Sequence, residues 1–283
     1  MKVELAIVGA GISGAAAALL AKASGLERVL ATEYEDRMGG LLRGLFAGPS
    51  FAEEAELMRR AAELPYEFRF RAAATSLFFD EDRGTHLIGL QGPAGHEDVE
   101  AERVLLCSGA FEKPREARRI PGSRPAGVMT PTMSVGLLDR GYVPGRRVLL
   151  AGRGRVVDGA ERRLKERGVS VERLDPALWD IAGVQGRERV DGVLARHVAS
   201  GEERLWPCDA FVYAEGRIPC TFYLKGSDIE RDENHAVVVD EAGRTNAYRV
   251  SAAGSCSSAG DDEHRSSAEQ ARRALASLLS WDD

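Results

Sequence analysis

The sequence predicts a doubly wound α/β fold with two Rossmann-like dinucleotide-binding domains, the second inserted in the first. Two glycine-rich turns carry this prediction: Gly9-Ala10-Gly11-Ile12-Ser13-Gly14 and Gly152-Arg153-Gly154-Arg155. Each turn follows a short apolar segment, as expected of a buried parallel strand, and leads into a segment of helical composition. Because a strand, a glycine turn and a helix form a phosphate-binding unit, the two turns predict two nucleotide sites.

The elements of the first domain follow from short apolar runs and from the residues that end them. An Ala/Leu-rich helix comes directly after the first glycine turn, and a later helix stops before Pro65. In chain order we expect strands at 3–8, 28–32, 68–79, 86–91 and 104–107, and helices at 13–24 and 52–64. This alternation of strands and helices predicts a parallel sheet with helices on its faces.

The second domain begins after residues 114–127, where Pro, Arg and Gly accumulate and indicate a crossover. Its expected elements are strands at 147–151, 169–174, 192–198 and 211–213 and a helix at 159–167. The chain then returns to the first domain with strands at 236–239 and 249–253 and a helix at 266–279. We therefore expect a first domain made of 1–112 and 222–283, with residues 113–221 inserted as the second.

Composition limits the function classes. The 283 residues suffice for two modest domains, and a net charge of −6 without a basic, aromatic-rich stretch argues against a nucleic-acid partner. The sequence contains no run of 18 apolar residues, so we expect no membrane span. The first strand leaves no room for a signal peptide. The four dispersed cysteines (Cys107, Cys208, Cys220 and Cys256) and five histidines without metal-ligand spacing favour a cytoplasmic protein without a metal site.

The first glycine turn matches the dinucleotide fingerprint at each position. Gly9 permits the tight turn, Gly11 lets the backbone approach a pyrophosphate, and Gly14 allows close packing of helix on strand. Glu33 follows Gly14 by 19 residues at the end of a strand, where its carboxylate can accept both ribose hydroxyl groups. The alternative is a glycine-rich turn without a ligand.

Two further segments resemble the FAD-binding, two-dinucleotide-domain flavoproteins of the pyridine nucleotide-disulfide oxidoreductase type, which are thioredoxin-reductase-like in fold. Glu33-Tyr34-Glu35-Asp36-Arg37-Met38-Gly39-Gly40-Leu41 is similar to their E…R-x-G-G segment, and Leu105-Leu106-Cys107-Ser108-Gly109-Ala110 to their A-T-G-A strand end. Taken alone, Gly39-Gly40 could also be a plain loop. The resemblance implies an FAD site formed by Gly9, Gly11, Ile12, Ser13, Gly14, Glu33, Tyr34, Arg37, Gly39, Gly40, Leu41, Ser108, Gly109, Gly254, Ser255 and Ala271.

The order of four more motifs resembles one branch of these flavoproteins. The motifs are Leu90-Gln91-Gly92-Pro93-Ala94-Gly95, Glu112-Lys113-Pro114, Pro121-Gly122 and Gly127-Val128-Met129-Thr130. The branch contains the FAD-binding subunits of hydrogen cyanide synthase, of opine oxidases and of dye-linked proline or hydroxyproline dehydrogenases, with the related region of sarcosine oxidase. The resemblance implies an FAD-binding electron-transfer subunit of a hetero-oligomeric amino-acid or amine dehydrogenase. Its implied partners are an amine-oxidising flavoprotein subunit, together with a small iron–sulfur subunit.

The chain departs from the family pattern where the FAD site closes. Ser255 stands in the place of an aspartate that binds the ribityl chain in the family, so a charge-assisted hydrogen bond worth about 1–2 kcal/mol is lost. Ala271 stands in the last helix at a position that is commonly glycine. We therefore expect FAD binding to be weaker than usual or altered.

The second glycine turn, with Gly152 and Gly154, is less regular because Val157 stands where a third glycine would be. Asp175, 21 residues beyond Gly154, could bind a ribose, which favours NAD or another adenine nucleotide over NADP. Arg153 and Arg155 could instead bring positive charge to phosphates. A vestigial fold unit and a solvated charged loop are the alternatives.

The sequence lacks the C-x-x-C pair and the C-x4-C pair through which related reductases pass electrons to disulfides. No acid–base or nucleophilic residue for substrate chemistry stands out either. These absences favour the FAD-binding subunit described above. The alternatives are a stand-alone NAD(P)H-dependent flavin reductase without the redox dithiol, and a degenerate nucleotide-binding scaffold or sensor.

Overall fold

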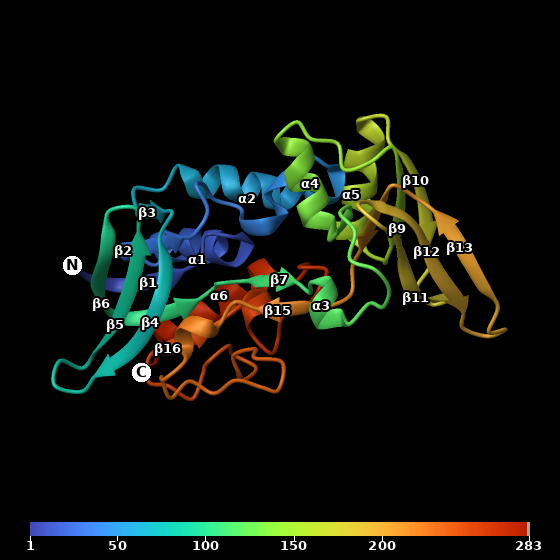
Figure 1. Cartoon of the computed structure of the whole chain (residues 1–283). Helices are drawn as coiled ribbons and strands as arrows, with labels where there is room; N and C mark the ends of the chain where they lie inside the picture. Colours follow the sequence, from blue (N-terminus) through green and yellow to red (C-terminus); the bar gives the residue numbers. More distant parts are fainter. Residues whose placement is uncertain (282–283) are drawn as a thin grey trace. The chain divides into compact units, whose positions relative to one another are not determined.

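The computed structural model describes residues 1–281 and divides into two compact units (Figure 1). Unit 1 contains Met1–Arg43, Ala52–Phe111 and the chain from Ile218 on, and unit 2 contains Gly44–Phe51 and Glu112–Arg217. The short segment Gly44–Phe51, which the expected boundaries put in the first domain, therefore packs with unit 2.

Unit 1 is built on a mixed sheet in the order β3-β2-β1-β6-β5-β4, with β16 also paired to β6. Strands β3, β2, β1, β6 and β16 are parallel, whereas β4 and β5 join as antiparallel neighbours. The strands are β1 (Lys2–Val8), β2 (Val29–Glu33), β3 (Glu67–Phe70), β4 (Ala73–Asp80), β5 (Thr85–Gly92), β6 (Gly95–Leu106) and β16 (Val250–Ala252). The helices are α1 (Ile12–Ala23), α2 (Ala52–Ala62) and α6 (Ser267–Leu279), with short 3-10 turns at η1 (Gly40–Leu45), η3 (Phe222–Leu224) and η4 (Gly254–Cys256).

Small side chains let α1 pack tightly in unit 1. Its alanines Ala15, Ala17, Ala18 and Ala21 are fully buried, and α1 contacts both α2 and α6. Alanine also has the best intrinsic helix propensity, so the same residues favour the helix and its close packing. The sheet side of the core is formed by apolar strand residues such as Leu5, Ile7, Leu30, Leu105 and Leu106.

Unit 2 contains a parallel sheet in the order β10-β9-β14-β8 and an antiparallel sheet in the order β11-β12-β13. The strands are β8 (Val128–Met129), β9 (Arg147–Ala151), β10 (Ser170–Leu174), β11 (Trp179–Gly186), β12 (Val190–His197), β13 (Glu203–Pro207) and β14 (Ala210–Tyr213). The helices are α3 (Arg115–Arg118), α4 (Pro131–Asp139) and α5 (Arg155–Glu166), and η2 (Pro49–Phe51) is a 3-10 turn. Leu149, Phe211 and Trp206 belong to its buried core. A further two-stranded sheet joins β7 (Ala110–Glu112) and β15 (Arg217–Pro219).

Several expected elements differ in the structure. The segment 68–79 forms two strands, because the chain turns at Arg71 with a φ of 55°. The helix expected at 159–167 begins at Arg155, directly after the glycine turn. The strand expected at 236–239 is wrong: the segment is irregular, since Val237 and Val238 donate their N–H groups to separate loops, at Cys256 and Glu230.

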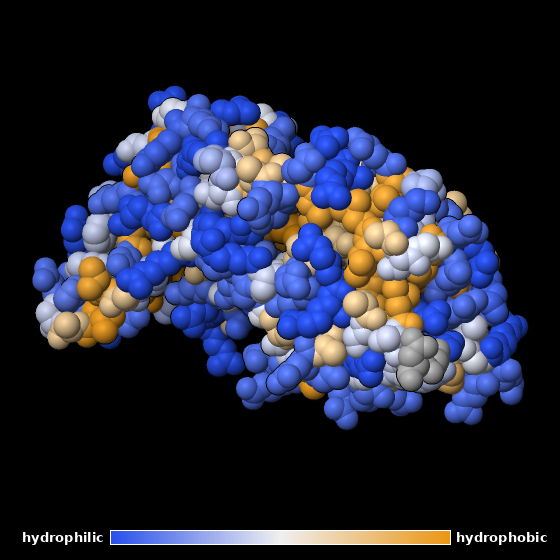
Figure 2. All heavy atoms as spheres, turned by 180° about the vertical axis from the view of Figure 1, so that it is seen from behind, coloured by the Kyte–Doolittle hydropathy of each residue, from blue (hydrophilic) through white to orange (hydrophobic). Residues whose placement is uncertain are grey.

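The surface seen in Figure 2 is largely hydrophilic and carries one broad hydrophobic patch. Among residues 1–281, no helix combines the length and apolar composition that a bilayer span requires. Exposed large hydrophobic side chains of unit 1 include Tyr34, Phe111 and Phe222. Tyr34 begins the loop after β2, which belongs to the site described below.

Candidate nucleotide-binding sites

In unit 1 the loops that follow four parallel strands emerge at one edge of the sheet. Strand β1 pairs with β2 on one side and with β6 on the other, and β16 pairs with β6. The strand order therefore reverses at β1, and ligands of open α/β sheets bind beyond the carboxyl ends of the strands at such a point. The loop after β1 contains Gly9 and Gly11, the one after β2 begins at Tyr34, and those after β6 and β16 contain Ser108–Gly109 and Gly254–Ser255.

The three glycines of the first turn have different roles. Gly9 has a φ of 105°, and a Cβ there would lie 2.2 Å from the Cys107 carbonyl oxygen. A Cβ on Gly14 would lie 1.9 Å from the Gly9 carbonyl oxygen, so packing requires both glycines. At Gly11, the N-cap of α1, no other atom of residues 1–281 would lie within 4 Å of a Cβ, and none of their side chains caps the helix. This open space before a helix N-terminus suits a phosphate.

Glu33 is fixed beside the same turn. Its side chain is 6% exposed; Oε2 accepts the Ala10 N–H at 3.1 Å and Oε1 accepts the Glu35 N–H at 3.1 Å. Burial raises the pKa of the Glu33 carboxyl, against the lowering effect of these two hydrogen bonds. Each carboxylate oxygen has a second lone pair, so both can still accept a hydroxyl proton. This arrangement fits the ribose role expected from the sequence.

The Gly39-Gly40 pair passes directly over the first glycine turn. Gly39 donates its N–H to the Ala10 carbonyl oxygen at 3.0 Å. Gly40 has a φ of 59°, and a Cβ there would lie 3.8 Å from the Gly11 Cα. Since a larger side chain at position 40 would enter the open space at Gly11, the pair keeps that space free.

The loops after β6 and β16 lie side by side. The Ser108 hydroxyl donates to the Cys220 carbonyl oxygen at 2.8 Å and accepts the Tyr223 hydroxyl at 3.3 Å. Gly109 has a φ of 74°, and a Cβ there would lie 3.9 Å from Ser255 Oγ. The structure thus brings Ser108, Gly109 and Ser255 together.

Other expected site residues anchor the loops or lie apart from them. Ser13 donates its hydroxyl to the Ser267 carbonyl oxygen at 3.2 Å, and a Cβ on Gly254 would lie 2.2 Å from Ser13 Oγ. Ile12 is buried, and Ala271 is fully buried in α6. Leu41 is half-buried, whereas Arg37 is exposed and pairs with Asp36.

Sequence reasoning missed Gln270, which is buried in α6. Its Oε1 accepts the Gly254 N–H at 3.1 Å, and its Nε2 donates to the Ala259 carbonyl oxygen at 2.6 Å. The side chain thereby fixes the loop after β16. A glutamine in an amphipathic helix carries no local signal for such a contact.

In unit 2 the second glycine turn is held by packing. Gly152 has a φ of 137°, and a Cβ there would lie 3.0 Å from the Ala214 Cβ and 3.2 Å from Val157 Cγ2. Val157 is buried and takes the place expected of a third glycine. Gly154, with a φ of 97°, is the N-cap of α5. The turn therefore keeps the strand–turn–helix geometry without the third glycine.

The carboxylate expected to bind a ribose in unit 2 is already bound by the turn itself. Arg153 donates from Nε to Asp175 Oδ1 at 2.9 Å and from Nη2 to Oδ2 at 2.8 Å, and the Ala177 N–H donates to Oδ1 at 2.9 Å. The Arg153 guanidinium lowers the pKa of the Asp175 carboxyl. Both side chains are substantially exposed, so the ion pair contributes little stability and a ligand can displace it.

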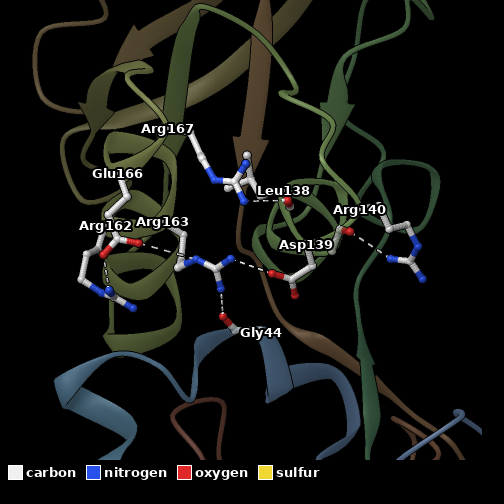
Figure 3. Close-up of polar contacts among 9 residues, drawn as sticks. Gly44, Leu138, Asp139, Arg140, Arg162, Arg163, Glu166 and Arg167 are labelled. Carbon is white, nitrogen blue, oxygen red and sulfur yellow. Dashed lines mark hydrogen bonds and ion pairs between the residues drawn. The ribbon is translucent and has the colours of Figure 1, made fainter.

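Two arginines of α5, Arg155 and Arg163, serve structure in unit 2. Arg155 is buried, donates to the Ser50 carbonyl oxygen at 3.1 Å and lies 4.4 Å from the centre of the Phe51 ring. Arg163 contacts the Gly44 carbonyl oxygen and pairs with Asp139 at 2.6 Å (Figure 3). These contacts bind the segment Gly44–Phe51 and helix α4 to α5. Their charges are engaged within the unit.

All four cysteines are free thiols. Cys107, Cys208 and Cys256 are buried and Cys220 is half-buried. Burial raises the pKa of every one of these thiols, to about 11 for Cys208 and to about 12 for Cys220. The thiolate is the nucleophile in disulfide exchange, and the raised pKa values oppose its formation at neutral pH.

Comparison with known proteins relates this geometry to redox enzymes. The pyridine nucleotide-disulphide oxidoreductase family matches residues 153–277. Thioredoxin reductase of Treponema pallidum is 27% identical over 282 residues, covering 89% of this chain and 88% of that protein. A subunit of the opine oxidase of Agrobacterium tumefaciens is 28% identical over 213 residues, covering 70% of this chain and 42% of that protein. The chain is an FAD-dependent oxidoreductase.

A solved structure supports the fold over the whole chain. L-proline dehydrogenase from P. horikoshii superposes with a TM-score of 0.75 at 22% identity, covering 99% of this chain and 56% of that one. Solved thioredoxin reductases share the same fold. The α/β fold with two Rossmann-like dinucleotide-binding units is therefore confirmed. The chain spans about half the length of both the proline dehydrogenase chain and the opine oxidase protein.

Proposed function

We propose that the chain is the FAD-binding electron-transfer subunit of a hetero-oligomeric amino-acid or amine dehydrogenase or oxidase, of the proline, hydroxyproline, opine or sarcosine type. One observation carries the proposal: in unit 1 the turn at Gly11 leaves open space before the N-terminus of α1, as a nucleotide diphosphate would need, whereas burial raises the pKa of all four thiols. A disulfide reductase needs a reactive thiolate close to its flavin. The chain keeps the flavin-binding part of such an enzyme without that relay.

The residues of unit 1 suit FAD. The open space at Gly11 and the N-terminus of α1 would hold the diphosphate, and Glu33 would hold the ribose next to the adenine base. Gly40, Ser108, Gly109 and Ser255 would line the remaining part of the site. FAD supplies redox chemistry when bound, and the residues of the chain bind and orient it.

The second site, in unit 2, suits NAD or another adenine nucleotide less well than the site in unit 1 suits FAD. A ribose diol would need the same edge of the Asp175 carboxylate that Arg153 now occupies with two hydrogen bonds. A nucleotide would therefore have to displace Arg153. We propose that binding there is weaker than in a reductase whose ribose-binding residue is free, so that NADH is a poor electron donor.

The proposed partners are an amine-oxidising flavoprotein subunit, together with a small iron–sulfur subunit. The opine oxidase relative is named as one subunit of its enzyme, and a proline dehydrogenase chain shares the fold. In unit 1 and unit 2, no acid–base group of the described residues stands out for substrate chemistry. This fits a chain that passes electrons and leaves substrate oxidation to a partner.

The test begins with the absorption spectrum and nucleotide content of the purified chain. We expect bound FAD, and no dye-linked oxidation of L-proline, hydroxyproline, octopine or sarcosine by the chain alone. Co-expression with an amine-oxidising flavoprotein subunit should restore activity toward one of them. Full activity of the isolated chain would rule out the subunit role.

The similarity to thioredoxin reductase over nearly the whole of both chains favours a second candidate, an NAD(P)H-dependent flavin reductase. Anaerobic mixing with NADH and with NADPH distinguishes the two functions. Rapid loss of the flavin absorption band would support the reductase. An unchanged band, with reduction by dithionite as the positive control, would support the subunit role.

A further inference from the structure

The loop between α4 and β9 exposes two consecutive large side chains of unit 2. Tyr142 is 66% exposed and Val143 is 49% exposed. The chain enters this loop through Gly141, whose φ of 83° is the left-handed conformation in which many helices end at a glycine. An apolar side chain after such a glycine frequently packs back on the helix. Tyr142 stays largely in solvent instead, so the end of α4 does not account for its exposed ring.

The backbone of this loop is fixed although its side chains are exposed. The Tyr142 N–H donates to the Leu137 carbonyl oxygen at 2.9 Å. Further along the loop, the Arg189 guanidinium donates to the Pro144 carbonyl oxygen, and Pro144 itself is buried. Little conformational entropy of the backbone therefore remains to be lost when a partner covers the exposed side chains.

Three exposed arginines lie around the same loop. Arg140 and Arg167 flank the last turn of α4 (Figure 3), where Arg140 donates to the Gly136 carbonyl oxygen at 2.9 Å and Arg167 to the Leu138 carbonyl oxygen at 3.3 Å. Arg146 directly precedes β9. Among residues 1–281, none of the three pairs with a carboxylate, so their positive charges remain available to a partner.

The charge of unit 2 favours an acidic partner. Asp139, the carboxylate next to Arg140, is already paired with Arg163 at 2.6 Å. Basic residues outnumber acidic residues in unit 2, whereas the reverse holds in unit 1 and the whole chain has a net charge of −6. An acidic surface is therefore attracted to unit 2 more than to the rest of the chain.

A partner at this loop leaves the second glycine turn open. Strands β9, β10 and β14 are parallel, the loop precedes the first residue of β9, and Gly152 follows its last residue. The two ends of this strand are about 13 Å apart at roughly 3.3 Å per residue. A protein at the loop and a nucleotide at the turn can therefore bind unit 2 at the same time.

We propose that the loop surface, formed by Tyr142, Val143, Arg140, Arg146 and Arg167, docks an acidic surface of the amine-oxidising subunit. This inference rests on the proposed function. Tyrosine and arginine are enriched in protein interfaces, and complementary charge selects the partner and accelerates association. The surface contains no group that transfers electrons, which fits a subunit that stays bound to unit 2 during turnover.

The experiment measures the affinity of the FAD-loaded chain for the amine-oxidising subunit whose co-expression restores activity, at low and at high salt. Arg146→Glu reverses one charge of the loop surface, and Val143→Ser removes one apolar side chain. Arg187→Glu and Val198→Ser are the matched controls, because both residues are exposed in unit 2 away from this loop.

We expect Arg146→Glu to weaken binding at least about tenfold at low salt and less at high salt, because salt screens exposed charges. Val143→Ser should weaken binding at least about threefold at both salt concentrations. The two controls should stay within about twofold of the unchanged chain. FAD content and unfolding midpoints in urea check that each variant folds, and if one variant does not fold, the other decides the question.

The failure of this inference differs from the failure of the proposed function. If the complex forms and the folded variants bind as the controls do, the loop surface is wrong and the proposed function stands. If no amine-oxidising subunit binds the unchanged chain, the proposed function fails and the docking surface fails with it. The inference is also overturned if Arg146→Glu leaves the affinity for the subunit unchanged and instead abolishes self-association of the chain or its binding to anionic phospholipid vesicles.

Discussion

Arg153 and Asp175 form a bidentate ion pair at the second glycine turn, with Nε–Oδ1 and Nη2–Oδ2 distances of 2.9 and 2.8 Å. The arginine belongs to the turn that should face a diphosphate, and the aspartate to the strand end that should face a ribose. The guanidinium and the carboxylate therefore bind each other at the position where both would contact a nucleotide. The pair reduces the charge that the site presents to a ligand.

Removing the arginine should improve nucleotide binding in unit 2. In Arg153→Ala the Asp175 carboxylate becomes available to a ribose diol, so the affinity for NADH should rise severalfold. Titration of the FAD-loaded protein with NADH measures this change. Arg196 and Glu203 form another exposed ion pair of unit 2, at 2.8 Å, so Arg196→Ala is the control and should leave NADH affinity unchanged. Weaker binding by Arg153→Ala would instead identify Arg153 as a phosphate ligand.

Substitutions at two glycines of the first turn should distinguish a role in stability from a role in ligand binding. Gly14→Ala places a Cβ 1.9 Å from the Gly9 carbonyl oxygen and should destabilise the protein by more than about 2 kcal/mol. Gly11→Ala meets open space, so its free energy of unfolding should stay within about 1 kcal/mol of the unchanged value. The same substitution should weaken FAD binding, because the methyl group occupies the space for the diphosphate. Urea unfolding and FAD titration measure the two effects, and FAD binding at full strength by Gly11→Ala would argue against the site.

Glu33→Gln should weaken FAD binding by at least about tenfold, since hydrogen bonds to a charged group are worth about 1.5–3 kcal/mol. The amide keeps the size of the side chain and can accept only one of the two backbone N–H groups, of Ala10 and Glu35, that the carboxylate now accepts. FAD titration is the measurement. Glu53→Gln, on the exposed side of α2, is the control. Equal affinities for Glu33→Gln and the unchanged protein would show that the ribose lies elsewhere.

His86 should make stability depend on pH. The side chain is buried, its Nε2 lies 2.9 Å from the Tyr248 carbonyl oxygen, and burial lowers the pKa of the imidazole below 6.5. At pH values between the lowered pKa of the folded protein and 6.5, the imidazole binds more protons in the unfolded chain than in the folded one. The free energy of unfolding should therefore be highest above pH 6.5 and should fall as the pH falls through the pKa that His86 has in the folded protein.

Urea unfolding over the range from about pH 5 to 8 tests this dependence. His86→Gln keeps a donor for the Tyr248 carbonyl oxygen and removes the titrating group, so its stability should vary less over this range. His96→Gln replaces an exposed histidine and should behave as the unchanged protein does. An equal slope for His86→Gln and the unchanged protein would assign the pH dependence to other groups.

The parts of the fold that local chemistry determines were predictable. Strands β1, β2 and β9 are short apolar runs before a turn, and the glycines at 9 and 14 are required by backbone contacts between near neighbours in the fold. The apolar run at 236–239 has the same composition, but only Val237 forms β-bridges, to Arg231 and Ser257, and no strand develops. Hydrophobic pattern alone does not say which backbone groups will find partners.

Side-chain partners within the sites were not predictable from spacing. Ser13 binds the carbonyl oxygen of Ser267, 254 residues away, and this contact depends on the packing of α1 against α6. The sequence offers Asp175 for a ribose or, alternatively, Arg153 for phosphates, but only the folded chain shows that the two side chains bind each other. Spacing placed both residues at the correct strand ends, whereas rotamers and distances determined their partners.

The thiols offer a direct check on the proposed absence of a dithiol relay. Because burial raises the pKa of each of the four cysteines, the native protein should react with less than about one equivalent of an aromatic disulfide reagent at neutral pH. Cys220 is the half-buried thiol and should account for any slow reaction, so Cys220→Ser should abolish it. Unfolding in urea should expose all four thiols and serves as the positive control. Rapid reaction of two thiols in the native protein, followed by loss of both on mild oxidation, would reveal a redox-active pair and would favour the reductase over the electron-transfer role.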